Sequence, residues 1–145
     1  MSTTDEFDHF VAAQEPVYEQ IVAELAAGRK RSHWMWFIFP QLRGLAQSAM
    51  SQRYALDSAE SAMRYLRHPL LGQRLRRCTQ LVLDIEGRTA EEILAMPDCL
   101  KFHSSMTLFA KSSPSDDLFQ CALEKYFRGE PDEKTIELLR QMSPR

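Results

Sequence analysis

The chain of 145 residues lacks several features that mark easily recognised classes of protein. Five glycines and seven prolines are too few for a collagenous or low-complexity chain. The three cysteines form no C-x-x-C pair, which excludes zinc-ribbon and thioredoxin-like motifs, and they are expected to be buried free thiols. The longest apolar run, 34–39, is far shorter than the ~20 residues of a membrane span, and the acidic N-terminus does not resemble a secretory signal. We therefore expect a cytoplasmic protein that makes no use of a membrane.

Motifs for common enzyme classes are also missing. The sequence contains no P-loop, no G-x-G-x-x-G, no H-E-x-x-H and no G-x-S-x-G. The four histidines form no pair spaced four residues apart, so neither a metal site nor a cofactor is expected. These absences leave the chemistry to be sought in less conventional clusters of residues.

The spacing of apolar residues is helical along nearly the whole chain. They recur at intervals of three and four, and no segment keeps the alternation typical of a strand. Ser58, Thr89, Ser115 and Asp132 each precede a helical pattern and are suited to cap it. The sequence predicts an all-α protein, with residues 1–145 as a single compact domain of about seven helices.

The net charge of −2 is the result of cancellation between regions. Residues 1–28 carry −6, residues 29–88 carry +7 and residues 89–145 carry −3. Either the acidic ends pack across the basic middle, or the middle, which is rich in arginine, contains a site for an anion. No sequence signature of a DNA- or RNA-binding fold is present, so a phosphate-bearing small molecule is the expected ligand and nucleic acid is not.

The segment 29–44 differs in composition from the rest of the chain. It holds both tryptophans, and four of the 14 aromatic residues fall within 34–39. A helix here would be aromatic on all sides, so it is either a core helix or the wall of a pocket. In a pocket, His33 and Gln41 would supply the polar groups.

Two further groups of polar residues have helical spacing. Lys101, Ser104 and Ser105 share one helix face, which is suited to hold an anion or, alternatively, is a solvated surface. Ser48 and Tyr54 follow the aromatic segment at similar spacing. They are either caps and core-edge contacts or a polar wall that faces the tryptophans.

Three strings of residues resemble the signature of a known family. They are S-H-W-M-W-F-I-F-P-Q-L at 32–42 with Ser48, Ser51 and Tyr54; Y-L-x-H-P-x-L-G-x-R-L at 65–75; and D-x-x-K-x-x-S-S-M-T-L-F at 98–109. This pattern resembles the family called domain of unknown function 1810, and the resemblance covers essentially the whole chain. It implies a mainly helical fold and no established activity.

A looser resemblance concerns the C-terminal half. A helix that opens at Asp98-x-x-Lys101 and is followed by 118–129 is similar in order to the helical NADAR domains. That resemblance implies cleavage of N-glycosides on nucleotide and ADP-ribose-type substrates.

Two functional hypotheses follow. In the first, the protein binds a nucleotide-like anion and hydrolyses an N-glycosidic bond, with His33, Asp98 and Lys101 as candidate catalytic residues. In the second, it is a non-catalytic module that binds a protein partner through an exposed aromatic groove. The candidate ligand-binding residues of the first hypothesis are Trp34, Trp36, Phe39, Gln41, Ser48, Tyr54, Arg74, Ser104 and Ser105.

Overall fold

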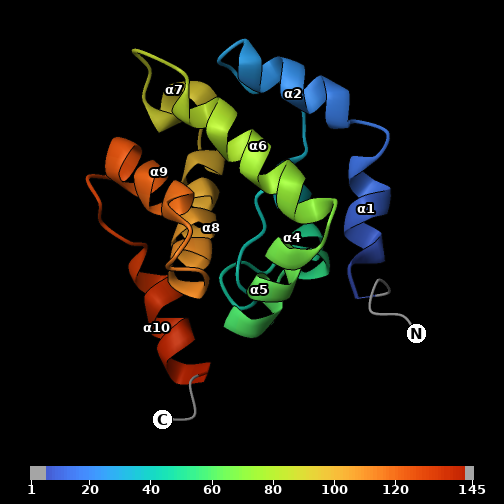
Figure 1. Ribbon diagram of the computed structural model, residues 1–145, viewed down its shortest axis with the longest axis vertical. Helices are drawn as coiled ribbons and strands as arrows, with labels where there is room; N and C mark the ends of the chain where they lie inside the picture. The colour runs from blue at the N-terminus through green and yellow to red at the C-terminus, as the bar shows by residue number, and fades with distance from the viewer. Residues whose placement is uncertain (1–5, 143–145) are drawn as a thin grey trace.

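The computed structural model describes residues 6–142, and this part of the chain contains ten helices and no named strand. The all-α prediction is therefore confirmed, with ten helices where about seven were predicted (Figure 1). The helices are α1 (Asp8–Gln14), α2 (Tyr18–Ala26), α3 (Met35–Ile38), α4 (Ala49–Arg53), α5 (Ala59–Arg67), α6 (Leu71–Leu83), α7 (Ala90–Leu94), α8 (Asp98–Ser112), α9 (Asp117–Phe127) and α10 (Glu133–Met142).

Helix α8 is the centre of the packing. It contacts α5, α7, α9 and α10, and every residue from 104 to 110 is buried. In Figure 1, α6 crosses the front of the molecule while α8 lies behind α9. Because α8 is enclosed almost all round along this stretch, only its two ends, near Asp98 and Lys101 and at Lys111, come close to the surface.

Local sequence signals explain several helix starts. The Ser58 and Thr89 hydroxyls accept hydrogen bonds from the backbone amides of Ser61 and Glu92, and both form capping boxes. Asp132 accepts from the amide of Thr135 at the start of α10, as predicted. At α9 the prediction of Ser115 is wrong by one residue, because the side chain that accepts from the first turn belongs to Asp116.

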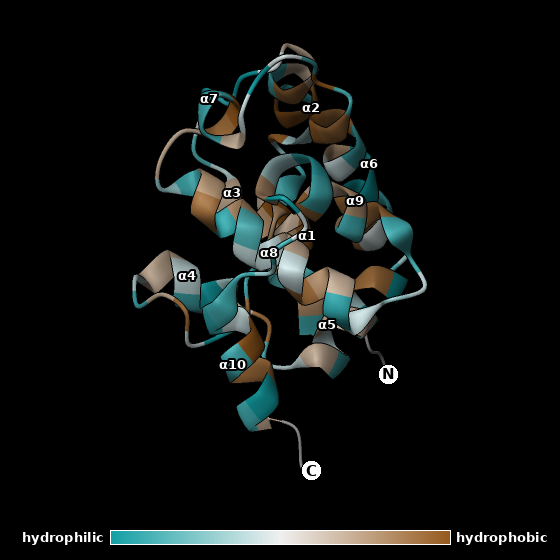
Figure 2. Ribbon diagram, turned by 90° about the vertical axis from the view of Figure 1, so that its left-hand side faces the viewer, coloured by the Kyte–Doolittle hydropathy of each residue, from teal (hydrophilic) through white to brown (hydrophobic). Residues whose placement is uncertain are grey.

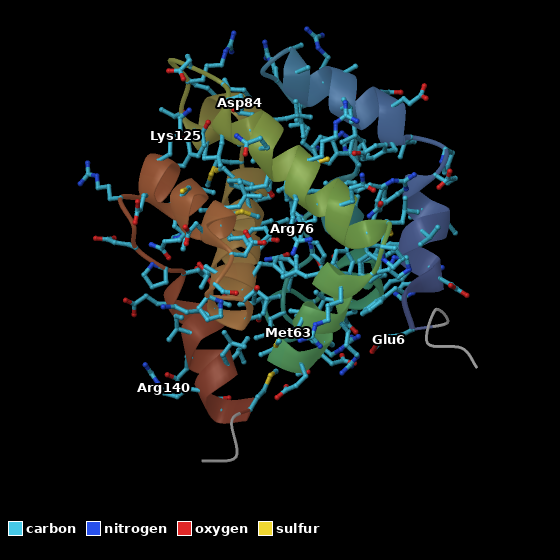
Figure 3. The ribbon with its side chains drawn as sticks, in the orientation of Figure 1. Glu6, Met63, Arg76, Asp84, Lys125 and Arg140 are labelled. Carbon is cyan, nitrogen blue, oxygen red and sulfur yellow. The ribbon has the colours of Figure 1, made fainter. Side chains whose placement is uncertain are left out.

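Ion pairs join the acidic ends of the chain to its basic middle. Arg64 pairs with Glu6 at 2.7 Å and Arg74 with Glu15 at 3.2 Å. Arg76, in the middle of α6, pairs with Asp116 at 2.9 Å (Figure 3). The neutralising interpretation of the charge pattern thus holds for these three arginines.

The prediction that all three cysteines are buried is only partly right. Cys78 and Cys99 are buried free thiols, but Cys121 is exposed, so the expectation that all three are buried is wrong. Within residues 6–142, none of the helices combines the length and the apolar character needed to cross a membrane.

Candidate functional site

The aromatic segment enters the core rather than forming one wall of a pocket. Trp34 and Phe39 are fully buried, and the Phe39 ring meets Phe102 of α8 edge-on, with centroids 5.0 Å apart. Trp36 is only partly buried. The core interpretation therefore applies to Trp34 and Phe39, and Trp36 is the one tryptophan with surface left for a ligand.

The Trp34 indole is fixed by a carboxylate that the sequence analysis missed. Its Nε1–H donates to Oε1 of Glu24, in α2, at 2.8 Å. The same carboxylate accepts from the backbone amides of Arg31 and Ser32, from the Ser32 hydroxyl at 2.6 Å and from the Gln20 side chain. Gly28, whose φ is +84°, ends α2 with a left-handed turn that sends these amides back toward Glu24.

These hydrogen bonds determine the charge state of Glu24. Burial of the side chain raises its pKa, but the bonds from Ser32, Arg31, Trp34 and Gln20 together outweigh burial and lower the pKa to about 2. Glu24 is thus an ionised structural group and is not a proton donor at neutral pH. Its position beside Ile21 and Leu25, on the buried face of α2, was the signal that it would be enclosed.

Next to this carboxylate, two lysines share one aspartate. Lys30 Nζ lies 2.8 Å from Oδ2 of Asp98, and Lys101 Nζ lies 3.8 Å from Oδ1 of the same side chain. Each ammonium also lies over an indole ring: Lys30 is 5.2 Å from the centroid of Trp34, and Lys101 is 5.1 Å from that of Trp36. We call these five residues the two-lysine cluster.

Elements far apart in sequence build this cluster. Lys30 is in the linker between α2 and α3, where its backbone amide donates to the Ile93 carbonyl of α7 at 2.8 Å. Asp98 and Lys101 lie one turn apart at the start of α8. The side chains of Lys30, Asp98 and Lys101 are only 8%, 19% and 20% exposed. The arrangement is a partly enclosed positive site in which two cations share one anion.

Comparison with known proteins places the chain in a family. A family model described as a protein of unknown function, DUF1810, matches residues 4–139. The chain belongs to the DUF1810 family. The resemblance found in the sequence is therefore confirmed.

A solved structure supports the assignment to DUF1810. The crystal structure of a conserved hypothetical protein from Mycobacterium tuberculosis is similar to this chain with 52% sequence identity and a TM-score of 0.92. The match covers 93% of this chain and 96% of the other. No curated protein matches this chain.

The structure separates the remaining predicted residues of this DUF1810 protein from the cluster. Ser104 is buried, and its hydroxyl contacts the Leu100 carbonyl and donates to Asp132, each at 3.2 Å, which links α8 to α10. Ser105 is fully buried, and its hydroxyl has no hydrogen-bond partner within the described chain. Lys101 therefore does not act together with Ser104 on one exposed polar face.

The other candidates serve local roles or stand apart. Ser48 caps α4, and Tyr54 is buried against the rings of Phe10 and Phe37. The Gln41 carbonyl accepts from the Leu56 amide. Arg74 binds Gln14 and Glu15 and lies over the Tyr18 ring at 4.4 Å, whereas His33 is exposed. In residues 6–142, none of these candidates shares a hydrogen bond, ion pair or ring contact with the two-lysine cluster.

The described residues contain no group of three or more histidine, cysteine or acidic side chains placed to hold a metal ion. What the cluster offers is a charge arrangement: ammonium groups for an anion, one carboxylate for a proton or a hydroxyl, and a partly exposed indole for an apolar ring.

Proposed function

We propose that this DUF1810 protein binds a nucleotide-like anionic small molecule at the two-lysine cluster. The observation that supports the proposal is that Lys30 and Lys101, both largely enclosed, share the single carboxylate of Asp98. An ammonium withdrawn from water requires a compensating partner, and Asp98 lies 1 Å closer to Lys30 than to Lys101. Lys101 is therefore the group with the greatest remaining attraction for an anion.

Trp36 provides the second part of the proposed recognition. Lys101 lies over its indole, and the residue is only partly buried. A base or another flat ring that packs on this indole brings its phosphate within reach of the Lys101 ammonium. Apolar contact with the ring and ionic contact with the phosphate together define a nucleotide-like ligand.

Hydrolysis of an N-glycosidic bond is the reaction we propose for such a ligand. Asp98 is the carboxylate of the cluster, and the Lys30 ammonium at 2.8 Å orients it. Its role would be to take a proton from the attacking water. The looser resemblance of the C-terminal half to NADAR domains points to the same class of reaction, and Glu24 contributes no acid because its pKa is about 2.

A second candidate function is recognition of a protein partner. Met96, two residues before α8, and Leu100, in its first turn, are 54% and 52% exposed and flank Asp98 of the two-lysine cluster in the sequence. Large apolar side chains exposed near a charged site are typical of interaction surfaces. The aromatic groove expected from the sequence is not the basis for this candidate, because Trp34 and Phe39 are buried.

Ligand-induced thermal stabilisation tests the first proposal. A ligand that binds only the folded state stabilises it by about 2.7 kcal/mol at a concentration of 100 times Kd. We expect adenosine monophosphate to raise the Tm of the wild type and of Lys111→Met, and to leave the Tm of Lys101→Met unchanged. Lys111 is the matched control because it is an exposed lysine on the same helix.

Other results would contradict the proposal. Equal Tm increases in both variants would place the ligand elsewhere, and no increase with any nucleotide at millimolar concentration would refute small-molecule binding. Release of the free base, measured by chromatography in wild type and Asp98→Asn, tests the hydrolysis separately. A nucleotide that binds but stays intact would refute the reaction alone.

A further inference from the structure

A hollow of about 600 Å³ opens directly beside the two-lysine cluster. It lies between the linker that follows α2, the loop between α6 and α7, and α7 itself; Figure 2 shows α2 and α7 at the same end of the molecule, above α3. Its volume falls in the range of small-molecule sites. Lys30 belongs to both the hollow and the cluster, so the two adjoin.

The lining of this hollow has charges of both signs. Its charged residues are Arg29, Lys30, Glu86, Arg88, Glu91 and Glu92. Lys30 is paired with Asp98, and the Glu92 carboxylate accepts a hydrogen bond from the Thr89 amide in the capping box.

The other four charged side chains of the hollow have no such partners within the described residues. Within residues 6–142, Arg29, Arg88, Glu86 and Glu91 make no side-chain hydrogen bond and no ion pair. Two guanidinium groups and two carboxylates thus line one hollow without pairing with each other. Gly87, between Glu86 and Arg88, adds no side chain that would fill the space.

We propose that this hollow binds the ribose phosphate portion of the ligand, with the phosphate at the boundary where Lys30 belongs to both the hollow and the cluster, a proposal that rests on the function proposed above. A guanidinium group presents paired N–H donors that match two oxygens of a phosphate, which suits Arg29 and Arg88. A carboxylate accepts hydrogen bonds from neighbouring sugar hydroxyls, which suits Glu86 and Glu91. A lining of one sign would favour a simple ion, whereas this mixed lining matches a ligand that carries an anion and a diol together.

Titration calorimetry with ribose 5-phosphate and glycerol 3-phosphate tests the inference. Both compounds carry a phosphate monoester, but only the first has the ribose. We expect Arg88→Met to weaken both about tenfold, and Glu91→Gln to weaken ribose 5-phosphate about fivefold while leaving glycerol 3-phosphate unchanged. The matched controls, Arg67→Met and Glu60→Gln, alter exposed residues of α5 outside the hollow and should bind as the wild type does.

Three outcomes would overturn the inference: absence of saturable ribose 5-phosphate binding, equal binding by wild type and Arg88→Met, and equal affinity for the two phosphates. If Arg88→Met is stable only at low temperature, Arg29→Met, which removes the other guanidinium group of the hollow, provides the same test. Loss of adenosine monophosphate binding in Lys101→Met but not in Arg88→Met would refute the hollow and leave the proposed function intact. Loss of adenosine monophosphate binding in Arg88→Met but not in Lys101→Met would refute binding at Lys101 and leave the hollow as the site.

Discussion

Replacement of Glu24 by glutamine is expected to destabilise the fold strongly at neutral pH and little in acid. The ordinary pKa of this carboxyl is 4.5, and its hydrogen bonds hold the folded-state pKa at about 2. A tenfold change in proton affinity corresponds to ~1.4 kcal/mol, so ionised Glu24 contributes ~3 kcal/mol at neutral pH. A glutamine keeps the shape, but its amide nitrogen would face a donor from Ser32 or Gln20.

The sign of the pH dependence follows from the direction of the pKa change. A carboxyl whose pKa is lower in the folded state stabilises the protein fully above its unfolded pKa of 4.5. That stabilisation is lost as the pH falls from 4.5 toward 2. The difference in unfolding free energy between wild type and Glu24→Gln should therefore be ~3 kcal/mol at pH 7 and should shrink across this interval.

Urea denaturation followed by tryptophan fluorescence measures this difference. Both tryptophans lie in the segment that Glu24 anchors, so the signal reports on that region. Glu19→Gln, an exposed change on the same helix, should alter stability by less than about 0.5 kcal/mol. Equal urea midpoints for wild type and Glu24→Gln at pH 7, or a difference that persists unchanged at pH 2, would refute the reasoning.

Three other changes have defined outcomes, each measurable by urea denaturation. Gly72→Ala should cost about 3 kcal/mol, because a Cβ there would lie 2.0 Å from the Leu66 carbonyl oxygen; a cost below about 1 kcal/mol would contradict this. Lys125→Met should cost about 1 kcal/mol, because its ammonium binds two carbonyls at the end of α6, near Asp84 in Figure 3; an unchanged midpoint would refute that role. The pKa of His9 is lowered by burial and then by the charge of Arg53, so wild type should lose stability relative to His9→Phe as the pH falls below 6.5; parallel pH profiles would exclude this.

Helix boundaries were predictable where the signal is local. The caps at Ser58, Thr89 and Asp132 depend on partners three residues away, and sequence spacing reveals such pairs directly. Pro16 separates α1 from α2 as its missing amide requires. The helix considered for the aromatic segment is present as the single turn of α3, whereas α4 was not predicted, because a helix of five residues depends on tertiary contacts rather than on apolar periodicity.

For the candidate site, the sequence predicted several of the residues but not which of them lie together. Trp36, Asp98 and Lys101 were selected from the sequence, but Ser104 and Ser105 were grouped with Lys101 by helical spacing alone. Spacing defines which residues share a face, and the surrounding helices decide whether that face meets solvent. Because α8 is enclosed on nearly all sides, both serines lie inside the protein.

Lys30 could not have been selected in this way. It was one of three consecutive basic residues, and its partner Asp98 lies 68 positions further along the chain. No local pattern distinguishes it from Arg29 or Arg31, which are exposed.

The ion-pair partners separate two kinds of basic residue in this chain. Arg64, Arg74 and Arg76 each have an acidic partner from an end of the chain, and at least one member of each pair is well exposed, so each pair contributes little stability. Lys30 and Lys101 instead share one acid and rest on indole rings, which attract a cation without neutralising it. A second carboxylate beside Lys101 would have neutralised the pair. Within residues 6–142, Lys101 forms no ion pair with a carboxylate other than that of Asp98, so the two ammonium groups of the cluster outnumber its one carboxylate and leave a positive charge for an anion.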